Sequence, residues 1–254
     1  MASKQVTDRE KSARAVGAAA ETHAKDIGAG LESALEPYLA KGETMPDLGL
    51  LARLLGRGIE ARAKALVDAD AAHEKELGDD AQPREDRDAA AEKVRHVLVD
   101  LRAVAEPTYG ATGLRMLGLA GPVPSDPSVL NTTAAAVGAA LLDDKLKLPK
   151  ARKGMKLDRQ VFADELAEIL PALGKALNDV AREAREAETT LTAKTRAMEV
   201  NDAGFTRAAG TLAMLAAAAG LDDLAARVRP SGRNPGRTAG TDPEPPVDGN
   251  GPPA

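Results

Sequence analysis

The 254-residue sequence contains no cysteine and no tryptophan, and it has only two phenylalanines and two tyrosines. The absence of cysteine excludes disulfides, thiolate metal sites and thiol nucleophiles, and it fits a reducing compartment. The scarcity of aromatic side chains removes the stacking platforms that bind single-stranded nucleic acid and the lining of an aromatic ligand pocket. The simplest interpretation is a cytoplasmic protein.

Long apolar runs are also missing. Residues 1–16, MASKQVTDREKSARAV, have no apolar core after their charges, so we expect no secretory signal. The most apolar stretch is LAMLAAAAGL at residues 212–221, which is about half the length of a membrane span and consists mostly of alanine. We therefore expect no membrane span, and we interpret this stretch as a closely packed helix.

Alanine, leucine, arginine, glutamate and aspartate are abundant, whereas β-branched residues are scarce. The abundant side chains lose little conformational freedom in a helix, and the scarce ones are those that favour a sheet. The composition therefore predicts an all-α fold, an elongated antiparallel helical bundle. Apolar periodicity and helix-stop residues predict helices over residues 9–40, 46–77, 86–106, 126–143, 158–200 and 205–229.

Apolar stripes mark the buried faces of these helices. Residues 46–77 carry a stripe at steps of three and four, formed by Leu51, Leu55, Ile59, Ala63 and Leu66. Residues 86–106 carry a second stripe with Val94, Val97 or Leu98, Leu101 and Val104, and Pro107 is expected to end that helix.

The longest stripe alternates steps of four and three and comprises Phe162, Leu166, Ile169, Leu173, Ala176, Val180, Ala184, Ala187 and Leu191. This spacing is typical of a coiled coil. Asn201 to Gly204 predicts a turn, after which Phe205, Leu212, Leu215 and Leu221 line a further helix.

The predicted domain organisation is a helical bundle over residues 1–229 and a disordered, proline- and glycine-rich tail over 230–254, which has almost nothing to bury. The predicted halves of the bundle are residues 1–125 and 126–229, with a basic connector at 145–157. An offset of 111 residues matches Leu51 with Phe162 and Leu55 with Leu166, which suggests two duplicated long-helix hairpins. The alternative is chance, because any two Leu/Ala amphipathic helices can be slid into partial register.

The order of a long Ala/Glu/Arg helix, the segment LAAAAGLDDLAARVRPSGR and a Pro/Gly tail resembles that of bacterial helical proteins whose function is uncharacterised. The resemblance covers residues 48–234. It implies a bacterial origin and brings no activity, ligand or site residue.

The histidines are the first candidates for chemistry. His96 shares one helix face with Glu92 and Asp100. If the chain formed a helical hairpin with its turn near residue 84, His73 would lie beside His96 on the neighbouring helix. His73, Glu92, His96 and Asp100 are therefore candidate metal ligands. Their spacing differs from the Glu-x-x-His pattern of di-iron proteins, so exposed pairing of His96 with acids is the favoured interpretation.

Residues 145–156, KLKLPKARKGMK, carry six cations in a chain of net charge −5: Lys145, Lys147, Lys150, Arg152, Lys153 and Lys156. The alternation of lysine with leucine before a proline predicts an extended connector with Leu146 and Leu148 pressed onto the bundle. The alternative is an electrostatic docking site. Nucleic-acid binding is disfavoured because the overall charge is acidic and no known binding module accompanies the cations.

No residue set combines a reactive group with an activator, so we expect a non-enzymatic structural or protein-interaction module, without a cofactor, that binds another protein or itself. The alternative is a helical regulator that binds a small ligand or metal near His73 and His96. An inward-facing cluster of polar residues would favour the ligand-binding alternative, whereas a dry Ala/Leu seam would favour the interaction module.

Overall fold

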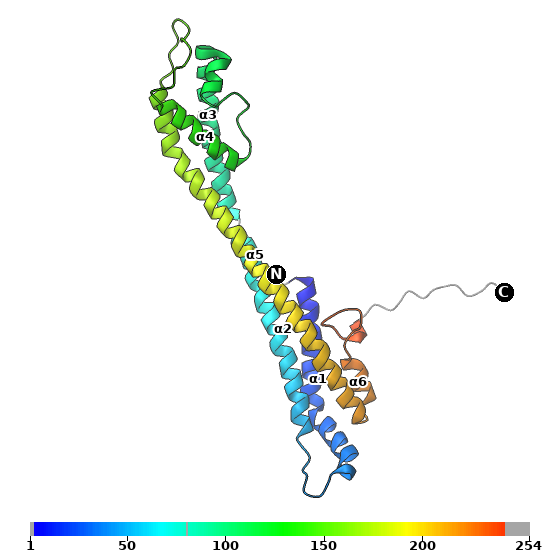
Figure 1. Cartoon of the computed structure of the whole chain (residues 1–254). Coiled ribbons are helices and arrows are strands. Elements are labelled where there is room, and N and C mark those ends of the chain that lie inside the picture. The colour runs from blue at the N-terminus through cyan, green and yellow to red at the C-terminus, as the bar shows by residue number, and fades with distance from the viewer. Residues whose placement is uncertain (1–2, 80, 242–254) are drawn as a thin grey trace, which may run out of the picture. The chain divides into compact units, whose positions relative to one another are not determined.

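The computed structural model describes residues 3–79 and 81–241, and within them the chain is helical and has no β-strand (Figure 1). The all-α prediction is confirmed. The α-helices are α1 Lys4–Leu35, α2 Leu48–Asp79, α3 Ala81–Met116, α4 Pro127–Leu142, α5 Arg159–Ala218 and α6 Asp222–Val228. Two short 3-10 helices, η1 Glu36–Tyr38 and η2 Ala239–Thr241, complete the described part.

The chain divides into two compact units. Unit 1 consists of the described parts of residues 1–75 and 189–254, and unit 2 consists of residues 76–188. Both α2 and α5 contribute residues to each unit. This division differs from the predicted halves at 1–125 and 126–229, because the two ends of the chain meet in unit 1 and the middle of the chain forms unit 2. The internal duplication stays a prediction.

The core of unit 1 lies between α1, the first part of α2, the last part of α5, and α6. Small residues bring α1 and α2 together, since Gly56 of α2 lies against Ala20 and Gly17 of α1. Of the predicted stripes, Ile59, Ala63, Leu66, Phe205 and Leu212 are buried. Leu51 is 40% exposed, so the stripe of α2 is buried only from its second half onward.

The core of unit 2 lies between α3, α4 and the first part of α5. Its fully buried side chains include Val94, Leu98, Leu101, Leu130, Leu166 and Leu173. The carboxylate of Asp126 caps the start of α4 by accepting hydrogen bonds from the backbone nitrogens of Ser128 and Val129 at 3.0 and 2.9 Å. Ala105, and not the predicted Val104, continues the buried face of α3.

The predicted end of the third helix at Pro107 is wrong. Helix α3 runs through Pro107 to Met116, and its backbone leaves helical geometry at Gly110, where φ is 71°. A positive φ is readily adopted by glycine and not by residues with a side chain, so the break falls on the glycine three residues after the proline.

The predicted turn at Asn201 to Gly204 is also wrong, because α5 continues without a break from Arg159 to Ala218. The helix brings Gly204 against the end of the Arg62 side chain, which would have to move if position 204 carried a side chain. Gly204 therefore makes room for a neighbouring helix. Polarity at Asn201 and Asp202 reflects buried contacts, described below, and not a turn at the surface.

The long stripe of α5 is only partly buried. Within unit 2, Leu166, Leu173 and Ala176 are buried, whereas Ala184 is exposed; Leu191, in unit 1, is 48% exposed. In unit 2 this later part of α5 lies close to charged residues, since Glu183 and Glu186 approach Glu76. The apolar face that a coiled-coil seam needs is therefore absent there, and the coiled coil stays a prediction.

The predicted start of the disordered tail at residue 230 is wrong, because residues 230–241 are folded. Residues 229–241, here called the C-terminal strap, fold back in unit 1 through a bridge between Pro230 and Thr238. The backbone nitrogen of Ser231 donates to Arg237 O at 2.8 Å, and that of Ala239 donates to Arg229 O at 2.9 Å. Ser231 and Thr238 are buried. The remaining residues of the predicted tail, 242–254, lie outside the described residues.

Across residues 3–79 and 81–241, no helix combines the length and the apolar composition that a membrane crossing requires.

Candidate functional site

The basic loop, residues 145–156, joins α4 to α5 in unit 2. Leu146 and Leu148 pack against the core of unit 2, as predicted from the alternation of leucine with lysine. The backbone nitrogen of Arg152 donates to Thr108 O at 3.1 Å, which fixes the middle of the loop to α3. The loop is therefore anchored by its leucines and its backbone, and its charged side chains are free to face outward.

All six cations of the basic loop are exposed. Among the described residues, none of the six makes an ion pair with an acidic side chain. The nearby Asp143 is engaged by the backbone, because its Oδ1 accepts a hydrogen bond from the Lys145 nitrogen at 2.8 Å. The loop thus presents concentrated positive charge that the protein does not neutralise by direct pairing.

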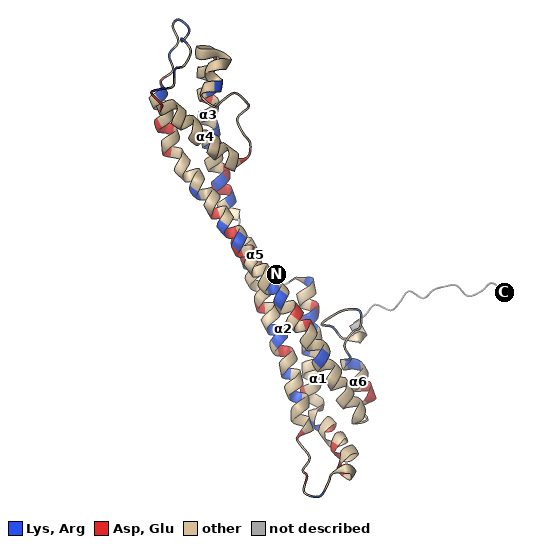
Figure 2. Ribbon diagram, in the orientation of Figure 1, with Lys and Arg blue, Asp and Glu red and all other residues tan. Residues whose placement is uncertain are grey.

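Helix α4 precedes the basic loop and is the one α-helix of the described part that contains no charged residue (Figure 2). Its inner face carries Leu130, Ala134, Val137 and Leu141, which are buried. Its outer face, here called the α4 face, is exposed and consists of Ser128, Val129, Thr132, Ala135, Ala136, Ala139 and Leu142. Surface helices of globular proteins usually carry charged or polar residues on the outer face.

The α4 face is therefore unusual for a helix in contact with water. Val129 is 53% exposed and Leu142 is 55% exposed, and alanines occupy three of the positions between them. Small side chains make this face shallow, so that a second helix can approach its backbone closely. The basic loop begins three residues after Leu142, at the carboxyl end of α4, where cations also complement the helix dipole.

The candidate metal ligands predicted from the sequence are divided between the two units. His96 Nε2 lies 3.0 Å from Glu92 Oε1 on the surface of α3 in unit 2, which confirms the expected pairing of His96 with an acid. Asp100 is exposed on the same helix. His73 belongs to unit 1, where it is buried with Nδ1 3.0 Å from Thr190 Oγ1. Each histidine thus has a partner within its own unit.

A cluster of three glutamates forms where α2 and α5 meet in unit 2. Glu76, Glu183 and Glu186 place carboxylate oxygens within 4.8 Å of one another, and among the described residues this is the group that could hold a metal ion. It contains neither His73 nor His96. Partial burial, together with the negative charges of Glu186, Glu183 and Asp79, raises the pKa of Glu76. Because acidic clusters are common without an ion, we treat this one as a source of repulsion.

Two largely buried ion pairs in unit 1, each with one buried and one half-buried partner, were missed by the sequence reasoning. The first centres on Asp70, which is fully buried and lies 2.7 Å from Lys194 Nζ through Oδ1. Its Oδ2 accepts a hydrogen bond from the Ser3 backbone nitrogen at 2.8 Å. Burial opposes ionisation of Asp70, but the hydrogen bonds and charge of Lys194 and Ser3 together outweigh it, so the pKa of Asp70 lies below its ordinary value.

The second pair joins Arg9 of α1, which is buried, to Asp202 of α5, which is half-buried. Arg9 Nε and Nη2 donate to Asp202 Oδ1 and Oδ2, both at 2.8 Å, which is the two-point geometry that favours arginine with a carboxylate. The side-chain hydrogen bond to Asp202 raises the pKa of Arg9 further above its ordinary value. Asn201, also buried, donates to Asp202 Oδ1 at 3.2 Å.

A signal for these pairs exists in the sequence. Asp70 stands four residues after Leu66 and Arg9 stands three after Val6, so both are polar residues on apolar stripes. A charged residue at such a position is expensive to bury unless it is paired. The stripe therefore indicates that a partner is needed, although it does not identify one that lies 193 residues away, as Asp202 does from Arg9.

Comparison of the chain with protein-family models, curated proteins and solved structures gives no significant match. The fold defines an all-helical protein of two units, one with paired charges in its interior and one with an uncharged helix face beside a basic loop. Functional inference therefore depends on these features.

Proposed function

We propose that the protein is a non-enzymatic helical interaction module of a bacterial cytoplasm, and that it binds another protein through the α4 face and the basic loop of unit 2. The observation that carries the proposal is the uncharged, exposed outer face of α4 beside six cations that have no acidic partner among the described residues. An uncharged helix face is normally covered by other parts of a protein, because exposing it to water forgoes the burial of apolar area.

The chemistry of the surface favours a protein over a membrane or a nucleic acid. Helices that lie in a membrane interface insert large apolar side chains, whereas the α4 face consists mainly of alanine, serine and threonine. The basic loop has no aromatic residue for stacking on bases. A second helix with small apolar residues, followed by acidic residues that meet the basic loop, would match both the shape and the charge of this surface.

The non-enzymatic part of the proposal rests on the sequence, in which no reactive group is accompanied by an activator. The alternative expected from the sequence, a regulator that binds a ligand or metal near His73 and His96, stays a prediction. The geometry offers it little support, since His73 bonds to Thr190 within unit 1 and His96 pairs with Glu92 within unit 2.

The proposal is tested by site-specific cross-linking, for which the cysteine-free chain is well suited. Ala136→Cys places a photoreactive maleimide on the α4 face, and Ala181→Cys places it on an exposed, charge-rich face of α5 in the same unit. Each labelled full-length protein is returned to an extract of its native cell and irradiated. The cross-linked peptides are then identified by mass spectrometry.

We expect a discrete cross-linked species from position 136 and not from position 181, with the partner peptide derived from a helix that has adjacent acidic residues. Replacing Lys145, Lys147, Lys150 and Lys153 by glutamine should reduce its yield, and raising the salt concentration should do the same, because screened charges attract more weakly. A cross-link between two copies of the chain would make the partner a second copy. Equal cross-linking yields at positions 136 and 181 would contradict the proposal. A yield at position 136 that stays the same when the four lysines are replaced would contradict it as well.

A further inference from the structure

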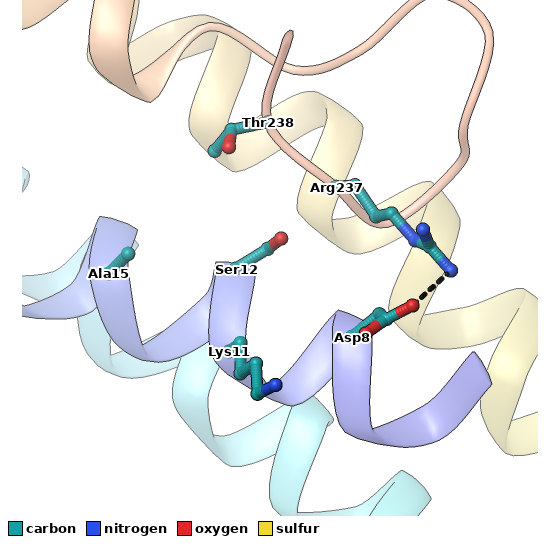
Figure 3. Close-up of a pocket in the computed structure, with 6 residues that line it drawn as sticks. All are labelled: Asp8, Lys11, Ser12, Ala15, Arg237 and Thr238. Atoms are coloured by element: carbon teal, nitrogen blue, oxygen red, sulfur yellow. Dashed lines mark ion pairs between the residues drawn. The ribbon is translucent and has the colours of Figure 1, made fainter. Parts of the chain in front are cut away.

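A pocket of about 430 Å³ lies in unit 1 between α1 and the C-terminal strap (Figure 3). Its volume falls within the range of small-molecule sites in proteins, roughly 300 to 1,000 Å³. One wall is formed by α1 and the other by the strap. The residues that line it are Asp8, Lys11, Ser12, Ala15, Arg237 and Thr238.

Ser12 is the most informative of these residues. It is only 4% exposed, and Figure 3 shows its hydroxyl pointing from α1 toward the strap segment that carries Thr238 and Arg237. Other hydroxyls on these helices bond to the carbonyl four residues earlier, as Thr7 does to Ser3 O at 3.2 Å and Thr206 to Asp202 O at 2.9 Å. The Ser12 hydroxyl makes no such bond and has no partner among the described residues.

The Ser12 hydroxyl oxygen is not one of the fully enclosed polar atoms that lack a partner, so it opens into the pocket and can bond there to a ligand or a water molecule. Ser12 therefore supplies one hydrogen-bonding group that is aimed into the pocket and not used by the fold itself.

The charges of the pocket favour an anion. Arg237 Nη2 lies 2.9 Å from Asp8 Oδ2, so the one carboxylate of the pocket is already neutralised. The guanidinium of Arg237 carries five N–H donors and can bond to a second group while it keeps Asp8. Lys11 is exposed and, within the described residues, is free of any ion pair. The lining thus has a net positive charge.

We propose that this pocket binds a small organic anion that presents carboxylate or phosphate oxygens. Arg237 bonds to the anion, Ser12 donates a hydrogen bond to it, and the flexible Lys11 side chain, which points away from the strap in Figure 3, turns toward the anion. Since Arg237 belongs to the strap and Ser12 to α1, the bound anion links the two and holds the strap in place. This site is in unit 1 and is independent of the α4 face in unit 2.

The experiment uses the full-length protein at about 0.15 M salt, where charges separated by more than roughly 8 Å are screened. Isothermal titration calorimetry with succinate and with inorganic phosphate measures binding, and the uncharged analogue succinamide tests the need for charge. Hydrogen exchange of residues 229–241 with and without succinate reports on the strap.

Two variants remove the groups that the proposal assigns, and two matched variants leave them intact. Ser12→Ala and Lys11→Gln alter the pocket, whereas Ser33→Ala and Lys25→Gln make the same changes at exposed positions of α1 outside it. Circular dichroism of each variant confirms that the helices are retained, and Ser→Ala is favourable within a helix.

We expect succinate or phosphate to bind saturably, succinamide not to bind, and the strap to gain protection. Ser12→Ala and Lys11→Gln should each weaken binding about five- to tenfold, as the loss of one hydrogen bond or charge contact predicts, while Ser33→Ala and Lys25→Gln leave it unchanged. Absence of saturable binding by both anions would overturn the proposal. Equal binding of succinamide, or equal loss in the matched variants, would overturn it as well.

Discussion

The two units of this protein differ in where they keep their polar groups. Among the described residues, the buried polar or charged side chains of unit 1 are Arg9, Ser12, Asp70, His73, Asn201, Ser231 and Thr238, whereas unit 2 buries only Thr108. Unit 2 instead exposes its charge, with six cations on the basic loop. In unit 1 the buried polar groups lie on the apolar stripes of the helices, as Arg9 and Asp70 do, or in the C-terminal strap, as Ser231 and Thr238 do.

Ion pairs inside a protein fix the register of neighbouring helices more strictly than an apolar core does. The hydrophobic effect is proportional to buried area and has no direction, so a core of alanine and leucine tolerates sliding between helices. A two-point pair such as Arg9 with Asp202 is satisfied in one register of α1 against α5, because any shift leaves a buried charge unpaired. Unit 1 is accordingly the better place for a defined ligand pocket, and unit 2 offers a surface for docking.

The largest expected effect comes from placing a charge in the apolar core of unit 2. Leu173 is fully buried, and Leu173→Asp would place an unpaired carboxylate among apolar neighbours. We expect the free energy of unfolding to fall by about 4 kcal/mol or more. Urea unfolding monitored by circular dichroism measures it. The exposed neighbour Ala172→Asp is the control and should change stability by less than about 1 kcal/mol.

The second prediction tests whether the charges of unit 1 act as a pair. Asp202→Ala removes the two-point partner of the Arg9 guanidinium and leaves it with the Gln5 carbonyl, 3.2 Å from Nη1, which should cost about 2 kcal/mol. Replacing both partners, as Arg9→Met with Asp202→Leu, removes the uncompensated charge and should restore stability to within about 1 kcal/mol of the original protein. A double variant as unstable as Asp202→Ala would show that the pair contributes more than mutual neutralisation.

The third prediction concerns pH and Asp70. Because the pKa of Asp70 is lower in the folded protein than in the unfolded chain, its stabilising contribution is present above the unfolded value, about 3.9, and is lost as the pH falls through the folded value. Asp70→Asn should destabilise unit 1 by about 2 kcal/mol at pH 7. The difference in melting temperature between the variant and the original protein should shrink below about pH 4. A difference that stays constant with pH would contradict the assignment.

The fourth prediction tests the C-terminal strap. Ending the chain after residue 229 removes the Arg237–Asp8 ion pair and uncovers Asp202, against which Gly236 packs closely. We expect a loss of about 1 to 2 kcal/mol, the sum of one partly exposed ion pair and a few hydrogen bonds. A chain ending after residue 241 keeps all of these contacts and serves as the comparison. Equal stability of the two truncated proteins in thermal unfolding would show that the strap adds nothing.

The smallest expected effect lies at the glutamate cluster of unit 2. A pKa raised in the folded state means that ionised Glu76 destabilises the protein, and this penalty appears as the pH rises. Glu76→Gln removes one of three neighbouring charges, so the melting temperature should rise slightly at pH 7. Below the pKa of an unperturbed glutamate, near 4.3, the carboxyl is protonated in both states and the gain should vanish. A decrease at pH 7 would indicate that Glu76 makes a stabilising contact instead.

Much of the local structure could be predicted from the sequence. The helices and most of their buried faces, such as Ile59, Ala63 and Leu66, follow from apolar residues that recur every three or four positions. The packing of Leu146 and Leu148 under an exposed basic loop follows from alternation before a proline. The pairing of His96 with Glu92 follows from their spacing on one helix.

The candidate sites could be predicted less well. Sequence reasoning identified the cations of the basic loop but not the uncharged face of α4 beside them, because exposure of that face depends on which side of the helix packs inward. It did not identify the pocket of Ser12 and Arg237 at all. These residues are 225 positions apart by their numbering, and nothing local indicates that the strap folds onto α1.

The sequence by itself determined that this protein is helical and which stripe of each helix is apolar, because residues three and four positions apart share one face of a helix wherever that helix packs. The tertiary structure alone decided that Asn201 to Gly204 stay helical, that residues 229–241 fold, and that Arg9 meets Asp202. Local signals at the first two of these positions favoured a turn and a tail. Buried ion pairs and close helix contacts between distant segments outweigh those signals, since an unpaired charge or a collision in the interior costs more free energy than a weak local preference.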